Sequence, residues 1–361
     1  MRRAMVLAQR GEGAVNPNPM VGAVIVRGDE VVAEGYHQRY GDLHAERNAF
    51  RVADERGLDC HGTTMYVTLE PCCHHGHQPP CTEAVIAHGV RRVVVGLLDP
   101  NPLVAGKGIA QLVAAGIEVD ALADDEPLHN ELIRQNRVFL HYITQRRPWI
   151  AAKYAMTLDG KICTRTGESQ WITGPEARKR VHQLRKKYSA ILCGIGTALA
   201  DDPMLDTRLE DDPTARCPIR IVLDRQARLP LSSKLATTAR KQRTIVVHTA
   251  EAPAERLEKL SEQGVETWLC PTLEDMMDRC GQEHIDSILV EGGGTVNEAM
   301  LCGGWIDEVY AFVAPKLIGG REAKTPVEGL GLARLSDAMV LHDIEVERCG
   351  QDILIHGLKK D

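Results

Sequence analysis

Two series of short apolar runs follow one another along this sequence, and a charged stretch at 144–148 that ends in Pro148 separates them. Short apolar runs indicate buried strands, and the amphipathic segments between them indicate helices that cover a sheet. A chain of 361 residues also exceeds the size at which one hydrophobic core usually stops growing. We therefore expect two α/β domains, at 1–145 and 146–361.

The expected strands are apolar runs bounded by polar or turn residues. In the first domain they are 21–26, 64–68 and 92–96, with the alternation continuing to about 117–119, and 124–142 is expected to form one or two helices. In the second domain the expected strands are 149–155, 190–193, 219–223, 244–248, 287–290 and 309–313, and the expected helices are 176–188, 252–263 and 296–301.

The charge balance favours small molecules as partners. Lys and Arg number 43 against 50 Asp and Glu, a net charge of −7, which disfavours nucleic acid and anionic membranes. No apolar run approaches the roughly 18 to 20 residues that cross a bilayer, and the apolar stretch after Met1 is too short for a signal peptide. The eleven cysteines are an odd number spread thinly, so we expect reduced thiols in a cytoplasmic protein without membrane contact.

The strongest chemical signal combines His44-Ala45-Glu46 with Pro71-Cys72 and Cys81. A zinc hydrolase needs three protein ligands, an open position for water, and a carboxylate nearby that shuttles protons. We predict His44, Cys72 and Cys81 as the ligands and Glu46 as the catalytic acid/base. Asp42 is expected to cap a helix whose first turn carries His44 and Glu46.

The cysteine spacing leaves alternatives open. Zinc deaminases usually carry Pro-Cys-x-x-Cys, whereas eight residues separate Cys72 from Cys81. A different ligand set from this interval is conceivable, because it contains Cys73, His74, His75 and His77. A purely structural zinc site would normally have four protein ligands and would leave Glu46 without a task. A deaminase of nucleic-acid bases would use the same zinc chemistry, but the acidic balance and the second domain argue against it.

Five motifs of the first domain closely resemble the deaminase half of bacterial bifunctional riboflavin-biosynthesis deaminase-reductases, whose cysteine spacing is equally long. They are Asn16-Pro17-Asn18-Pro19-Met20-Val21-Gly22-Ala23-Val24, His44-Ala45-Glu46, Glu70-Pro71-Cys72, Pro79-Pro80-Cys81 and Asp99-Pro100-Asn101-Pro102. The resemblance implies a cytidine-deaminase-like three-layer αβα domain with one zinc ion. It also implies that Asn18 and His37 line the pyrimidine and ribose site and that His74 helps to hold the substrate.

The second domain resembles the reductase half of the same family, which has a dihydrofolate-reductase-like α/β fold. Residues 152–161 and 167–174 carry this resemblance. The family hydrolyses the 2-amino group of 2,5-diamino-6-(5-phospho-ribosylamino)pyrimidin-4(3H)-one and then uses NADPH to reduce the ribosyl group to a ribityl chain. The alternative reading is a zinc deaminase of nucleic-acid bases fused to an oxidoreductase of another substrate. The resemblance further suggests a homo-oligomer, a dimer or tetramer, assembled through the second domain.

Individual reductase residues follow from the resemblance. The NADPH contacts it implies are Ala155, Trp171, Thr197, Asp201, Gly293, Gly294 and Thr295, and the substrate contacts are Lys153, Ser169, Arg185, Leu205, Arg208 and Glu291. Guanidinium groups bind phosphate bidentately, so Arg185 and Arg208 suit the ribose 5-phosphate. The 291–295 loop precedes a helix and offers backbone amides to a pyrophosphate, although the Rossmann fingerprint is absent.

Two roles in the reductase half stay open at this point. Glu291 and Lys153 are the candidates for a proton donor, because hydride transfer itself needs close placement more than an unusual side chain. Arg225, which follows the expected strand 219–223, is predicted to contact the 2′-phosphate of NADPH.

Overall fold

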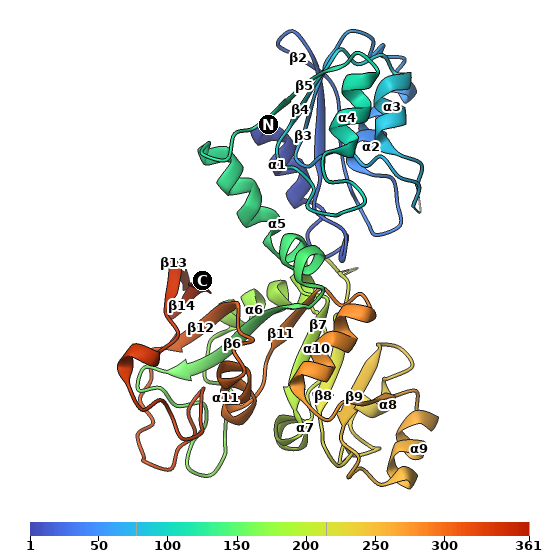
Figure 1. The fold of residues 1–361 in the computed structure, drawn as a ribbon. Helices are drawn as coiled ribbons and strands as arrows, with labels where there is room; N and C mark the ends of the chain where they lie inside the picture. Colours follow the sequence, from blue (N-terminus) through green and yellow to red (C-terminus); the bar gives the residue numbers. More distant parts are fainter. Residues whose placement is uncertain (77, 214, 361) are drawn as a thin grey trace. The chain divides into compact units, whose positions relative to one another are not determined.

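The computed structural model describes residues 1–76, 78–213 and 215–360, and the chain in it divides into two compact units, Met1–Arg146 (unit 1) and Arg147–Asp361 (unit 2). The division lies within the charged stretch 144–148. Each unit is built on its own sheet with helices on both faces (Figure 1). The α/β fold class expected for each half of the chain is therefore confirmed.

Unit 1 contains a five-stranded sheet in the order β2-β1-β3-β4-β5. Its strands are β1 (Gly22–Arg27), β2 (Glu30–Tyr36), β3 (Thr64–Val67), β4 (Arg92–Val95) and β5 (Glu118–Ala121). Strand β1 runs antiparallel to β2 and β3, whereas β3, β4 and β5 are parallel to one another. The loop that follows β3 therefore leaves the sheet at the same edge as the loop that follows β4.

Helices of the described residues cover both faces of the sheet of unit 1 (Figure 1). They are α1 (Arg2–Gln9) and α5 (Pro127–Gln145) on one face and α2 (Ala45–Glu55), α3 (Cys81–Ala87) and α4 (Lys107–Ala114) on the other. Side chains alternate along a strand, so Val24 packs with Leu7 of α1 while Ile25 packs with Phe50 of α2. Helix α2 approaches β2 closely, because a Cβ at Gly35 would lie 2.4 Å from the Ala49 nitrogen.

Unit 2 contains a nine-stranded sheet in the order β10-β9-β8-β7-β11-β6-β12-β14-β13. The strands are β6 (Trp149–Thr157), β7 (Ala190–Gly194), β8 (Ile219–Leu223), β9 (Thr244–His248), β10 (Glu266–Leu269), β11 (Ser287–Val290), β12 (Glu308–Ala314), β13 (Leu341–Cys349) and β14 (Asp352–Lys359). All neighbours are parallel except β14, which is antiparallel to β12 and β13.

Helices bury both faces of this sheet. They are α6 (Pro175–Lys187), α7 (Ile195–Asp201), α8 (Lys234–Thr237), α9 (Ala254–Glu262), α10 (Leu273–Gln282) and α11 (Gly294–Cys302), with a short 3-10 helix at Leu335–Asp337. Ile150 and Leu192 belong to the same core as Met276 of α10, whereas Leu289 on the opposite face packs with Leu184 of α6. Burial on both faces explains why these strands read as continuous apolar runs.

The sequence located the buried strands better than the exposed ones. Strands β8, β9 and β11 begin and end where the apolar runs predicted. The hairpin β13–β14 was missed, because polar residues occupy most of β13 and its side chains are largely exposed. No helix in the described ranges combines the length and apolarity needed to cross a membrane.

Candidate active sites

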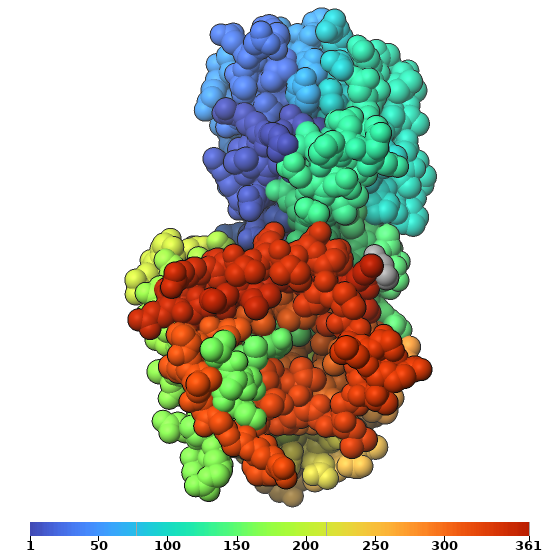
Figure 2. Space-filling model, turned by 90° about the vertical axis from the view of Figure 1, so that its left-hand side faces the viewer, coloured from blue at the N-terminus to red at the C-terminus, as the bar shows by residue number. Residues whose placement is uncertain are grey.

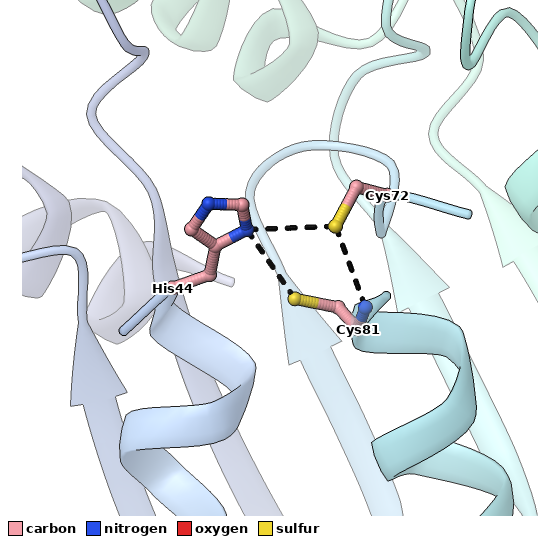
Figure 3. A group of neighbouring side chains, drawn as sticks. All are labelled: His44, Cys72 and Cys81. Atoms are coloured by element: carbon pink, nitrogen blue, oxygen red, sulfur yellow. Dashed lines mark hydrogen bonds between the residues drawn. The ribbon is translucent and has the colours of Figure 1, made fainter. Parts of the chain in front are cut away.

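Three side chains from separate elements converge in unit 1. His44 is the N-cap of α2, Cys72 lies in the loop after β3, and Cys81 is the first residue of α3. The Nδ1 atom of His44 lies 3.5 Å from the Sγ atoms of both cysteines, and the backbone N–H of Cys81 donates to Cys72 Sγ over 3.3 Å (Figure 3). All three possible ligand atoms lie within 4.8 Å of one another.

This geometry fits a tetrahedral zinc ion. Zinc bonds of roughly 2.3 Å to sulfur and 2.0 Å to nitrogen place two such donors about 3.5 Å apart across a tetrahedral angle, as His44 and each cysteine are. Hydrogen bonding with Cys81, followed by that with His44, lowers the pKa of Cys72. The same contact and burial raise the pKa of Cys81. The pair thus favours one thiolate, and a bound cation would release the second proton.

Glu46 stands beside this cluster without belonging to it. It lies in the first turn of α2 with only 3 % of its surface exposed. Burial, and after it the charge of Cys72, raises the pKa of Glu46. A buried carboxyl next to a three-ligand site has the position that proton transfer to a substrate requires.

Asn18 and His37 form a pair next to the ligands. His37 Nδ1 donates to the Leu43 carbonyl over 3.0 Å, so its Nε2 accepts from the Asn18 amide at 3.1 Å. The ring centroids of His37 and His44 are 5.3 Å apart. Asn18 therefore keeps one amide hydrogen and its Oδ1 atom for a ligand, beside a histidine that lies next to the zinc ligand His44.

Among the described residues, the alternative ligands between Cys72 and Cys81 do not join the possible metal group. The Cys73 thiol donates to the Leu103 carbonyl over 3.8 Å, and the described group that can hold a metal contains neither Cys73 nor the nearby His74 and His75. His74 has a buried Nδ1 atom without a hydrogen-bond partner. His77 lies outside the described residues.

Unit 2 contains a cleft of about 1860 Å³. Loops that follow β7, β8, β9 and β11 line it, so it opens at the carboxyl ends of the parallel strands, where ligands bind in open α/β sheets. Every reductase residue expected from the sequence lines this cleft: Lys153, Ala155, Ser169, Trp171, Arg185, Thr197, Asp201, Leu205, Arg208, Arg225, Glu291, Gly293, Gly294 and Thr295.

A buried ion cluster lies in this cleft. Glu291 accepts two hydrogen bonds from Arg185, at 2.7 and 3.0 Å, and one from Lys153 at 3.2 Å. Burial opposes ionisation of Glu291, but the charges of Arg185 and then Lys153 lower its pKa well below the ordinary range. Because Arg185 Nη1 also donates to the Asp206 carbonyl, its guanidinium is engaged by protein groups. The open phosphate fork expected from the sequence is therefore not the geometry observed for Arg185.

Helix α11 points its amino end at the cleft. Gly293 is its N-cap, and a Cβ at Gly292 would lie 2.7 Å from that of Val296. The Thr295 hydroxyl donates to Glu328 over 3.1 Å. The close packing of the loop on its helix leaves backbone N–H groups at the helix end, which suits an anion.

Two family models match the chain. The "RibD C-terminal domain" matches residues 148–355, and the "Cytidine and deoxycytidylate deaminase zinc-binding region" matches residues 1–97. The second range contains His44, Glu46, Cys72 and Cys81. A riboflavin biosynthesis protein RibD of Actinobacillus pleuropneumoniae is 46% identical over 98% of this chain and 93% of its own length. The chain belongs to the RibD family.

Solved RibD structures agree with this assignment. One from Acinetobacter baumannii is 35% identical, with a TM-score of 0.89 over 100% of this chain and 98% of its own. A Thermotoga maritima protein, described as a diaminohydroxyphosphoribosylaminopyrimidine deaminase/5-amino-6-(5-phosphoribosylamino)uracil reductase, is 37% identical, with a TM-score of 0.87 over 100% and 97% of the two chains. Unit 1 thus carries the zinc-binding region of a RibD protein, and unit 2 carries its C-terminal domain.

The structure corrects one detail of this RibD zinc site. Asp42 does not cap α2, because His44 itself is the N-cap residue, with extended backbone angles, and Asp42 lies in an exposed turn. His44 therefore precedes the helix, which lets its ring face the two cysteines while Glu46 follows on the first turn.

Sequence reasoning missed three residues that support the RibD zinc site. Glu70 accepts from three backbone N–H groups, of Asp99, Gly106 and Ile109, and only its place before Pro71-Cys72 marked it. Arg47 donates to the carbonyls of Pro79 and Pro80, just before Cys81. Asn136, where the helical angles of α5 are interrupted, bonds both the N–H and the carbonyl of Met20 and so holds the Asn18 loop. Nothing in the sequence near Arg47 or Asn136 indicated these contacts.

Proposed function

We propose that this chain catalyses two consecutive steps of riboflavin biosynthesis. The first is the deamination of 2,5-diamino-6-(5-phospho-ribosylamino)pyrimidin-4(3H)-one in unit 1, and the second is the reduction of the product's ribosyl group in unit 2. The observation that carries the proposal is a three-ligand cluster beside buried Glu46 in unit 1 and a separate cleft in unit 2. The Thermotoga maritima relative, described by both activities, matches the chain over its full length.

In the deaminase site, the chain's residues position the pyrimidine and move protons. His44, Cys72 and Cys81 would hold a zinc ion, which would supply Lewis acidity for the attack of water. Glu46 takes a proton from the attacking water and gives it to the leaving amine, so that an oxygen replaces the amino group and ammonia departs. Asn18, fixed by His37, hydrogen-bonds the substrate ring.

In the reductase site, the ion cluster sets the protonation pattern. NADPH bound in this cleft would supply a hydride to C1′ of the ribose. The bond between C1′ and the ring oxygen then breaks, and that oxygen takes a proton. Arg185 and Lys153 keep Glu291 ionised, so Glu291 serves as a hydrogen-bond acceptor for substrate and Lys153 is the proton donor. The amino end of α11 would hold the cofactor's pyrophosphate.

We place the protein in the cytoplasm as a homo-oligomer joined through unit 2. All eleven cysteines are free thiols, as is usual in reducing compartments. The hairpin β13–β14, in the red C-terminal segment of Figure 2, exposes Val346, Ile353 and Ile355 by 69 %, 44 % and 37 %. The strand register puts these three side chains on one face. An apolar face of this kind is suited to a second copy of the chain.

The deciding experiment is mass analysis of the diaminopyrimidine nucleotide after incubation with the zinc-loaded protein. Without NADPH, the product should show an amino group replaced by oxygen together with released ammonia. With NADPH, it should gain two further hydrogens. Ammonia release from oligonucleotides, with none from the diaminopyrimidine nucleotide, would overturn the proposal and favour a nucleic-acid deaminase.

A further inference from the structure

The segment 204–208, which borders the reductase cleft, is held by side chains of residues that lie outside this segment in the sequence. Each of its residues has a backbone group that is hydrogen-bonded to such a side chain. The pairs are Met204 O with Arg220 Nη1 (3.2 Å), Leu205 O with Gln242 Nε2 (3.1 Å), Asp206 O with Arg185 Nη1 (3.0 Å), Thr207 N with Cys217 Sγ (3.5 Å) and Arg208 N with His182 Nδ1 (3.2 Å).

The segment needs these anchors because its backbone is strained. Leu205 adopts φ +49°, in the left-handed region, which is unfavourable for a residue with a side chain. Leu205 is buried, whereas the Arg208 side chain is 65 % exposed and lines the cleft. The anchors therefore fix the backbone from which the Arg208 side chain extends, and its Nε atom lies 3.2 Å from Asp206 Oδ1. Together these contacts limit where its guanidinium can meet a bound anion.

His182 is the anchor closest to Arg208. It lies on α6 three residues before Arg185, so both side chains leave the same face of the helix. A backbone N–H can only donate, so the Nδ1 atom of His182 must offer a lone pair to the Arg208 N–H. The contact therefore exists only while the imidazole is neutral, because an imidazolium carries hydrogen on both nitrogens.

The surroundings of His182 favour the neutral form. Arg185 on the same helix and Arg208 on the segment face it, as do Asp206 on the segment and Glu291 after β11. Burial lowers the pKa of His182, the charges of Arg185 and Arg208 lower it further, and the two carboxylates oppose this effect.

We propose that His182 is a positioning residue of the reductase site, whose neutral imidazole fixes Arg208 for the anionic substrate. The inference rests on the proposed reductase function, since it concerns the same cleft. It predicts that His182 acts on substrate binding through Arg208 and leaves NADPH binding unchanged.

The test compares His182→Ala with His182→Asn in steady-state NADPH oxidation on the deaminated nucleotide, using the zinc-loaded full chain. His182→Ala should raise the substrate KM about tenfold with little change in kcat. His182→Asn should restore KM, because the Asn Oδ1 atom accepts from the same N–H without titrating. Gln183→Ala, the exposed neighbour on α6, is the matched control and should behave like the wild type. Ammonia release by the same samples reports that unit 1 is intact.

The pH dependence of the substrate KM shows whether His182 acts as a hydrogen-bond acceptor or only as a packing residue. As pH falls from about 7.5 to 5, the wild-type KM should rise relative to that of His182→Asn, because only the wild type loses its acceptor on protonation. The substrate phosphate also titrates in this range, but it does so equally for both proteins. A constant ratio, or a His182→Asn variant as weak as His182→Ala, would overturn the proposal.

Hydrogen exchange keeps the inference independent of the proposed function. In His182→Ala the amide of Arg208 should exchange faster, whereas in His182→Asn it should stay protected. If the wild type fails to oxidise NADPH, the proposed function is wrong, but the anchoring role is not yet refuted. The anchoring role is refuted if the Arg208 amide exchanges at the same rate in His182→Ala as in the wild type.

Discussion

In unit 1, three ligand atoms from three elements lie within 4.8 Å of one another, whereas in unit 2 the residues of the second site are spread around a cleft of about 1860 Å³. The first site is set by metal–ligand bond lengths, so every donor is indispensable. The second is set by many hydrogen bonds and ion pairs, each of modest strength. We therefore expect single substitutions to act sharply in unit 1 and by degrees in unit 2.

The largest effect should come from removing a metal ligand. Cys81→Ser should lose zinc and ammonia release together, since two remaining ligands bind zinc poorly. Cys73→Ser is the matched control and should keep about one zinc ion per chain, because the Cys73 thiol bonds the Leu103 carbonyl. Metal analysis of the purified variants measures both. Zinc lost from Cys73→Ser but kept by Cys81→Ser would show that the ligand set is wrong.

Removing the acid/base should separate the two activities. Glu46→Gln should lower ammonia release by ~10²- to 10⁴-fold while zinc stays bound, because Glu46 carries the proton and is not a ligand. Supplied with the already deaminated nucleotide, the same variant should oxidise NADPH at close to the normal rate. Loss of NADPH oxidation in a folded, zinc-loaded Glu46→Gln protein would break the picture of two independent sites.

Breaking the ion cluster should have the converse effect. Glu291→Gln leaves Arg185 and Lys153 as buried cations without a carboxylate, and removing one member of a buried ion pair costs about 3–5 kcal/mol. The unfolding free energy of unit 2 and the rate of NADPH oxidation should fall, while ammonia release persists. Glu274→Gln, which breaks the more exposed pair with Arg147, should change denaturant unfolding little. Equal effects of the two substitutions would contradict the importance of burial.

A smaller effect on activity is expected from Arg225, the cleft residue that we predict to contact the 2′-phosphate of NADPH. Arg225→Ala should raise the KM for NADPH about tenfold and leave that for NADH unchanged, because only NADPH carries a 2′-phosphate. Arg228→Ala changes another arginine of the same cleft wall and serves as the control. Equal changes in both KM values for Arg225→Ala would remove this role.

The sequence indicated the three side chains that the structure brings together as a possible metal group, because they occur in short motifs. His44-Ala45-Glu46 and Pro71-Cys72 each place a donor next to a strand or helix end, and the fold needs only to bring those ends together. The capping role of Asp42 was wrong, because Asp42 and His44 were both possible helix starts and His44 is the N-cap in the structure.

The sequence was less informative where a residue works through a distant partner. Arg185 has the guanidinium group that suits a phosphate, but this group is hydrogen-bonded to Glu291, 106 positions away in the sequence. Asn136 and Arg220 act on loops that are remote in sequence, and the left-handed φ of Leu205 has no local signal such as glycine. Tertiary packing determines these contacts, and the periodicity and motifs of a sequence carry no information about that packing.

Within the described residues the two sheets exchange no strand: every strand of the first precedes Arg146, and every strand of the second follows it. Each sheet is therefore encoded by one uninterrupted stretch of the gene, and a single junction joins the two stretches. Joining two ancestral reading frames at this junction, or separating them again, would require no rewiring of either sheet. The architecture thus makes gene fusion and fission simple evolutionary steps for a pair of consecutive activities.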